Sequence, residues 1–209
     1  FVGFELRAFK QTNGAPACGA VHPDSGGNIA PTLTLGPLER GTQARIATLP
    51  EVTVSARAHA LDHALEVQLP FLQRLLGDFG VVPLIVGQAS AGAVADVLEA
   101  LWGGRETLIV ISSDLSHYLP YEAARKADRA SVDAMLSLEP TLDHDHACGA
   151  TPGNGLLEVA RRRGMEIELL DLRNSGDTAG DRDRVVGYAS LALYEQGEAK
   201  GGRDDTESV

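Results

Sequence analysis

A continuous apolar run near the middle of the chain leads directly into a cluster of polar side chains. Residues 108–111 are aliphatic and uncharged, which is typical of a strand buried on both faces of a parallel sheet. The polar residues that follow within six positions are Ser112, Ser113, Asp114, Ser116 and His117. Ligands of open α/β sheets bind beyond the carboxyl ends of strands, so this placement predicts a functional site. The alternative is that Asp114 or Ser116 caps the next helix and that His117 is a surface residue.

Apolar positions with helical spacing predict helices on both sides of this run. They cover residues 61–79, 90–102, 121–138 and 153–163. Pro70 is expected to kink or divide the first helix, because proline lacks an N–H and clashes with the preceding turn. Ser90 is expected to cap the second helix.

Short apolar runs at residues 81–86, 166–172 and 185–193 predict further strands, and Pro83 places the first of them at a sheet edge. Strands that alternate with helices predict an α/β fold with a mostly parallel or mixed central sheet flanked by helices. We expect a single domain over residues 1–194, whose N-terminal part is incomplete or diverged, and a disordered tail over residues 195–209.

Composition narrows the class of protein. The formal net charge of -11, from 29 acidic and 18 basic residues, argues against binding to nucleic acid or to an anionic membrane. No stretch approaches the roughly 20 apolar residues of a membrane-spanning helix. The two cysteines, Cys18 and Cys148, are too few for a disulfide framework, which favours a reducing cytoplasmic location.

Two residues stand out as candidates for chemistry. His117 lies three residues after Asp114 and can act as a general base whose tautomer a carboxylate fixes. Cys148 precedes a predicted helix, whose N-terminus favours a thiolate that could be a metal ligand or a nucleophile. A small buried hydrophobic residue is an equally good interpretation of Cys148.

The other histidines give weaker signals. His144 and His146 alternate with aspartates and resemble a metal tract, although such short polar loops are more often solvated, so we leave them out of the site. His59 and His63 are spaced i, i+4 and could share a helix face, but the glutamate of a His-Glu-x-x-His motif is absent. His22 lies in a Gly- and Pro-rich segment where spacing specifies little.

Four blocks together resemble the Memo-like family, also called AmmeMemoRadiSam system protein B. They are HALDHALEVQLPFLQ (59–73), VISSDLSHYLPYEAA (110–124), ACGATPGNGLLEVARRRG (147–164) and NSGDTAGDRDRVVGYAS (174–190). The resemblance implies a fold similar to that of class III extradiol dioxygenases of the LigB type. It implies a pocket that binds iron or copper.

The resemblance also assigns roles to individual residues. It places Cys148 among the metal ligands with His22 as a second ligand, and it gives His117 and Asp114 the acid–base position. His63 and Ser113 are expected to line the pocket. This sequence departs from the family pattern in lacking the N-terminal His-Ala-Gly-Tyr segment and in carrying Ala150 where the family often has arginine.

The function that these features predict is metal-dependent redox activity on an unknown substrate. A non-catalytic protein that binds a small-molecule or peptide ligand in the same fold is the alternative. A true ring-cleaving extradiol dioxygenase is a third possibility, against which the thiol of Cys148 counts, because those enzymes use a carboxylate. The family resemblance implies a pathway link to a radical-SAM enzyme and an AMMECR1-like protein.

Overall fold

The computed structural model describes residues 4–10, 40–55, 64–76, 79–178 and 180–197. Its strands are β1 (Phe4–Lys10), β2 (Gly80–Val86), β3 (Thr107–Ile111), β4 (His117–Leu119), β5 (Glu166–Asn174) and β6 (Val185–Tyr194). Its helices are α1 (Arg40–Ile46), α3 (Ala64–Leu76), α4 (Ala91–Leu101), α5 (Tyr121–Leu136) and α6 (Ala150–Arg163), with a short 3₁₀ helix at Ser175–Asp177. None of the helices in these ranges is long and apolar enough to cross a membrane.

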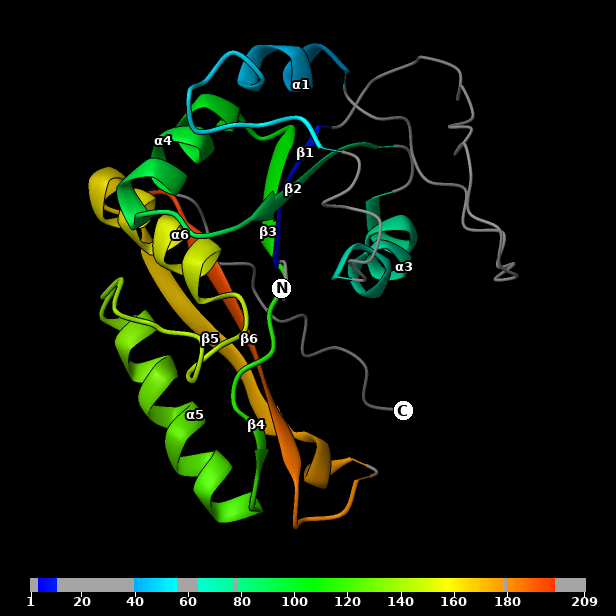
Figure 1. Ribbon diagram of the computed structural model, residues 1–209, viewed down its shortest axis with the longest axis vertical. Helices are drawn as coiled ribbons and strands as arrows, with labels where there is room; N and C mark the ends of the chain where they lie inside the picture. Colours follow the sequence, from blue (N-terminus) through cyan, green and yellow to red (C-terminus); the bar gives the residue numbers. More distant parts are fainter. Residues whose placement is uncertain (1–3, 11–39, 56–63, 77–78, 179, 198–209) are drawn as a thin grey trace.

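The described strands form two three-stranded sheets, in the orders β2-β1-β3 and β4-β6-β5 (Figure 1). The α/β class predicted from the sequence is confirmed. The strand pairing differs from the prediction of a mostly parallel or mixed sheet. Every pair of neighbouring strands in the described part of the chain is antiparallel. The crossover through α4 makes β2 and β3 parallel to each other, as the strand–helix–strand pattern predicts, but β1 lies between them and runs the other way.

Helices cover both faces of the first sheet. The inward face of α4 carries Val94 and Leu98, which pack with α6 against Ile109 and Ile111. Val110 alternates to the other side, where it contacts the cluster built around Leu69 of α3. In Figure 1, α4 and α6 lie on one side of β3 and α3 on the other.

β3 differs from its prediction. The apolar run predicts a strand buried on both faces, but in the described part β3 lies at a sheet edge and Leu108 is 43% exposed. The other edge of this sheet is β2, as Pro83 predicts, since proline cannot donate to a sheet ladder. β3 carries neither proline nor charge, so its residues give no sign of an edge position.

The helices begin and end close to the predicted positions. Ser90 caps α4, its Oγ accepting a hydrogen bond from the Ala93 N–H at 3.2 Å, as predicted. α6 begins three residues earlier than the pattern predicts and ends at Arg163, as predicted; the next residue, Gly164, caps it with a φ of +64° that suits glycine. α3 continues through Pro70 without being divided.

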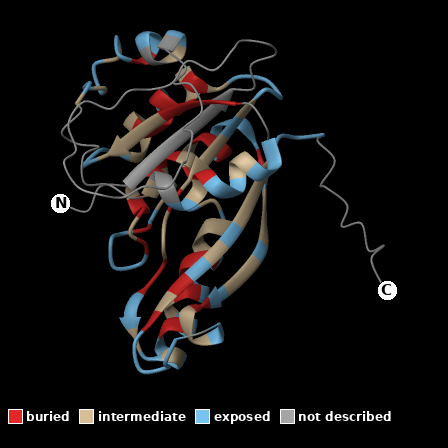
Figure 2. Cartoon of the chain, turned by 90° about the vertical axis from the view of Figure 1, so that its right-hand side faces the viewer, coloured by how far each residue is buried: buried red, intermediate tan, exposed pale blue. Residues whose placement is uncertain are grey.

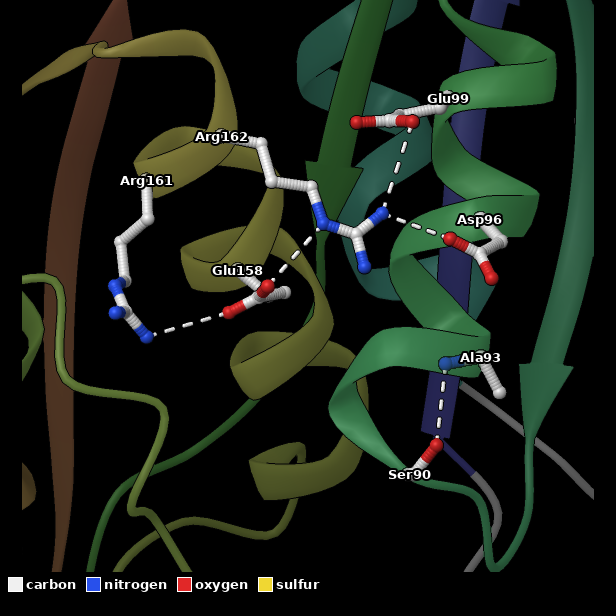
Figure 3. Close-up of polar contacts among 7 residues, drawn as sticks. All are labelled: Ser90, Ala93, Asp96, Glu99, Glu158, Arg161 and Arg162. Atoms are coloured by element: carbon white, nitrogen blue, oxygen red, sulfur yellow. Dashed lines mark hydrogen bonds and ion pairs between the residues drawn. The ribbon is translucent and has the colours of Figure 1, made fainter.

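α4 and α6 are held together by close packing and by charge. A Cβ on Gly155 would lie 2.2 Å from Cγ1 of Val94, so the two helices approach closely only because this residue is glycine. At the surface, Arg162 of α6 pairs with Asp96 at 2.7 Å and Glu99 at 3.7 Å on α4, and with Glu158 on its own helix (Figure 3). This packing fixes α6, whose N-terminal end follows Cys148.

The second sheet is covered by α5. Val132 of this helix packs with Leu115 and with Leu169, Leu172 and Ala189 of β5 and β6. Most residues of these two strands are only partly buried (Figure 2), and the buried ones lie at the end of β5 (Asn174) and the start of β6 (Val185 and Gly187). The segment between β3 and β4, which carries the predicted site, therefore links the two sheets.

Candidate metal centre

Three side chains of metal-ligand type converge where β3 leads into β4. They are Asp114, His117 and Cys148, and their ligand atoms all lie within 4.8 Å of one another. Nε2 of His117 is 3.6 Å from Oδ2 of Asp114, which is too long for a hydrogen bond. The side chains of His117 and Asp114 are 35% and 47% exposed and Cys148 is partly buried, so the cluster is open to solvent on the side of the imidazole and the carboxylate.

Backbone hydrogen bonds dock Cys148 against Asp114 in both directions. The Asp114 N–H donates to Sγ of Cys148 at 3.0 Å, and the Cys148 N–H donates to the Asp114 carbonyl at 3.1 Å. An N–H directed at sulfur stabilises negative charge on it, as a thiolate ligand requires. The loop that precedes α6 is thus fixed to the end of β3.

Ser113 supports the same junction. Its Oγ accepts a hydrogen bond from the Gly149 N–H at 2.8 Å, donates to the Asp114 carbonyl at 2.7 Å and lies 3.7 Å from Sγ of Cys148. A Cβ on Gly149 would lie 2.6 Å from Cβ of Ser113, so only glycine allows this approach. Ser113 was predicted to line the pocket, and the structure places it directly behind the cysteine.

Ser112 ties the end of β3 to α3. This serine is 7% exposed and its Oγ accepts a hydrogen bond from Nε2 of Gln68 at 3.2 Å. Sequence analysis did not select Gln68, although it lies in the first block of the family resemblance. Its contribution depends on a contact between segments that are distant in sequence.

The backbone is strained beside His117. Tyr118 has a φ of +59°, a left-handed conformation that is uncommon outside glycine. Arg184 lies over its ring, with Cζ 4.8 Å from the centroid. Strain of this kind persists where the surroundings enforce it and often accompanies functional sites.

Tyr188 of β6 is a neighbour that sequence analysis missed. Partial burial, and then the negative charge of Asp114, raise the pKa of the Tyr188 phenol above its ordinary value. The sequence of β6 alone does not show that Tyr188 lies near Asp114. Its proximity to the site follows from the pairing of β6 with β4.

A cavity of about 860 Å³ lies beside the cluster. Its lining comes mainly from β3, β6 and α6 and includes Ile109, Leu156, Leu191 and Leu193. Ser113 and Gly149 lie on its wall, whereas Asp114, His117 and Cys148 are not among its lining residues. The metal-ligand cluster therefore lies next to the cavity and not inside it.

The histidines of the loop before Cys148 do not join the cluster. His146 pairs locally with Asp143, Nδ1 to Oδ1 at 2.8 Å, and both side chains are exposed. Among the described residues, the cluster of metal-ligand type includes neither His144 nor His146. This agrees with the prediction that His144 and His146 lie outside the site.

The last family block, 174–190, is mostly structural. Asn174 and Asp177 form a reciprocal capping box around the 3₁₀ helix. The Tyr121 hydroxyl donates to Asp177, and this bond, followed by one from the Asn174 N–H, lowers the pKa of the Asp177 carboxyl. The block fixes the turn that returns the chain to β6.

Several sequence predictions fall outside the described residues. They concern the metal ligand His22, the pocket-lining His63 and the weaker candidate His59. The disordered tail was predicted from residue 195, and residues 198–209 lie outside as well. These assignments stay predictions.

Comparison with known proteins supports the resemblance. A model of the family described as "Memo-like protein" matches residues 40–192, which is most of the chain. The chain belongs to the Memo-like protein family. All three members of the candidate centre lie inside the matched region.

Individual Memo relatives agree with this membership. A "MEMO1 family protein" of Archaeoglobus fulgidus is 36% identical over 148 residues, 65% of this chain and 56% of the relative. One of Methanococcoides burtonii is 36% identical over 181 residues, 80% of this chain and 65% of the relative. One of Thermoplasma acidophilum is 37% identical over 143 residues, 64% of this chain and 53% of the relative. The chain thus spans between about half and two thirds of their length.

Proposed function

We propose that Asp114, His117 and Cys148 bind one iron or copper ion and that this Memo-family protein has metal-dependent redox activity. The observation that carries the proposal is the convergence of a carboxylate, an imidazole and a thiol from two separate segments within 4.8 Å. The chemistry of the donor set fits, because imidazole suits iron and copper and a soft thiolate favours copper(I) and iron.

The donor geometry supports the same function. Three protein ligands leave coordination positions for a substrate or for oxygen. A bound iron or copper ion would supply one-electron chemistry. The Asp114 N–H already directs a hydrogen bond to the sulfur, and Ser113 holds the loop behind it.

This assignment differs in one respect from the family resemblance, which gives His117 and Asp114 acid–base work and pairs Cys148 with His22. We favour the ligand role for His117 and Asp114, since both side chains lie close to Sγ of Cys148. The proposal makes no use of His22.

Metal content tests the function directly. Protein purified anaerobically is loaded with Fe(II) or Cu(I), desalted and analysed by inductively coupled plasma mass spectrometry. We expect close to one ion per chain in wild type and in His146→Ala, which removes an exposed imidazole outside the cluster. Cys148→Ala and His117→Ala should lose the ion. A wild-type protein without metal, or equal metal in all four proteins, would contradict the proposal.

The cavity favours a second candidate, a ligand-binding protein without turnover. Its volume of about 860 Å³ suits a small molecule, and its wall contains none of the three proposed metal ligands. In that case an apolar fluorescent probe such as anilinonaphthalene sulfonate should bind equally well with and without a chelator. Binding that requires the metal would rule this candidate out.

A further inference from the structure

A buried carboxylate stands behind the candidate metal centre without belonging to it. Asp128 of α5 is 2% exposed, and its Oδ1 accepts a hydrogen bond from the Ser116 N–H at 2.9 Å. No ion pair of Asp128 occurs among residues 40–55, 64–76, 79–178 and 180–197. A buried carboxylate without a cation is costly for folding, so its presence calls for an explanation.

The absence of a side chain at Gly187 leaves room for the Asp128 carboxylate. A Cβ on Gly187 of β6 would lie 2.1 Å from Oδ2 of Asp128, so the carboxylate occupies the place where a side chain would otherwise be. Gly187 also holds the segment from its other side, because its N–H donates to the Ser116 carbonyl at 2.9 Å and its carbonyl accepts from the Leu115 N–H at 2.8 Å. Both polar groups of the Ser116 backbone are thereby fixed.

The Ser116 side chain takes no part in this arrangement. Its Oγ is buried and has no hydrogen-bond partner in the described part of the chain. The segment is therefore held by its backbone, between Asp128 on one side and β6 on the other. His117 is the next residue, and Asp114 lies two positions earlier.

We propose that Asp128 is a positioning residue that fixes the Ser116 peptide and so directs the His117 imidazole toward Asp114 and Cys148. The effect of Asp128 on metal binding rests on the proposed metal site. Two anchors then build the centre. The Asp114 backbone holds the cysteine by donating to its Sγ and accepting from its N–H, and Asp128 orients the histidine. Removing Asp128 should move the imidazole while the sulfur keeps its place.

Substitutions at Asp128 separate this role from a general effect on folding. Asp128→Asn keeps the shape and an oxygen that can accept from the Ser116 N–H. Asp128→Ala removes the acceptor. Asp133→Asn is the matched control, because Asp133 is an exposed carboxylate on the same helix, paired with Arg129 at 2.9 Å. If Asp128→Ala does not fold, Asp128→Ser replaces it, since its hydroxyl is one atom shorter than a carboxylate oxygen.

The first readout is cobalt(II) binding to the full chain, followed by absorption. We expect Asp128→Asn and Asp133→Asn to match wild type within about threefold, and Asp128→Ala to bind about 10–100-fold more weakly, the range for a residue behind a metal ligand. The d–d bands of cobalt should change in Asp128→Ala while the thiolate-to-cobalt band persists. Wild-type affinity and spectrum in Asp128→Ala, or an equal loss in Asp128→Asn, would overturn the proposal.

The second readout uses the metal-free protein. Amide exchange measured by NMR should show the Ser116 N–H protected in wild type and Asp128→Asn and exposed in Asp128→Ala, with the His117 ring resonances shifted in the alanine variant alone. If wild type binds neither cobalt nor, in the loading experiment above, Fe(II) or Cu(I), the proposed function fails, and this measurement still decides the role of Asp128. Equal protection of Ser116 in all variants would refute it.

Discussion

Two histidine-bearing segments of this chain contain the same kinds of side chain but differ in what those side chains meet. His117 and Asp114 lie beside a thiol brought from another segment, and the three ligand atoms share one site. His146 and Asp143 pair with each other inside a single exposed turn. The loop before α6 thus gives Cys148 to the centre and keeps its histidines outside. Residue type alone does not mark a ligand, because a site needs convergence from separate parts of the fold.

The strongest way to break this comparison is to exchange the histidines for alanine one at a time. His117→Ala should weaken metal binding by more than about 100-fold, beyond the range for residues behind the ligands. His146→Ala should stay within about twofold of wild type, since its imidazole pairs only with Asp143 in the described turn. Competition against a chromophoric chelator measures both, and equal losses would show that the two segments do not differ.

Ser113 offers a smaller and more selective change. Ser113→Ala leaves the Gly149 N–H without its acceptor, so we expect about 1 kcal/mol less free energy of unfolding. Metal affinity should fall about tenfold, because the cysteine loop loses its support. Urea unfolding and chelator competition give the two numbers. A loss of stability without any loss of affinity would mean that Ser113 holds the fold but not the centre.

The pKa of Asp143 tests the other side of the comparison. Partial burial alone would raise the pKa of this carboxyl, but hydrogen bonds from the backbone of His146 and Asp145 and the charge of His146 outweigh it and hold the pKa below 3.8. A lowered pKa stabilises the turn above about pH 3.8, and this contribution disappears as the pH falls through the folded-state value.

Asp143→Asn should therefore abolish the acid sensitivity of this turn and leave metal binding unchanged. NMR titration of the Asp143 carboxyl and of the His146 amide checks the prediction. An Asp143 midpoint above 3.8, or a metal affinity that falls in Asp143→Asn, would show that the turn is connected to the centre.

The smallest effect is expected far from both segments. Arg162→Gln removes the pairs that join α6 to α4 at the surface, and exposed ion pairs contribute little to stability. We expect thermal unfolding to shift by no more than a few degrees and the metal content to match wild type. A loss of metal here would show that the position of Cys148 depends on the surface pairs of α6 as well as on Gly155 packing.

Most helices and strands of residues 80–197 were predicted from the sequence, because their apolar periodicity is strong and local, whereas the three-residue strand β4 was not predicted. Ser90 as a cap and Pro83 as a mark of an edge strand both follow from the chemistry of single residues. The edge position of β3 could not be predicted. It depends on the pairing of β1 between β2 and β3, which are distant from β1 in sequence.

The site divides in the same way. Asp114, His117 and Cys148 were selected from residue type and family blocks, and their convergence came only from the fold. Asp128 and Tyr188 were missed because their proximity to the site arises from tertiary contacts: α5 and β6 bring them there. A carboxylate in the middle of an amphipathic helix looks like a surface residue until its burial is known.

X-ray absorption spectroscopy tests the central claim most directly. Wild-type protein loaded with one Fe(II) or Cu(I) should show one sulfur scatterer at about 2.3 Å together with nitrogen or oxygen ligands, by analogy with thiolate–zinc distances. The sulfur should vanish in Cys148→Ala and remain in His146→Ala. A wild-type spectrum with no sulfur, or one that the Cys148→Ala substitution leaves unchanged, would contradict a centre built on Asp114, His117 and Cys148.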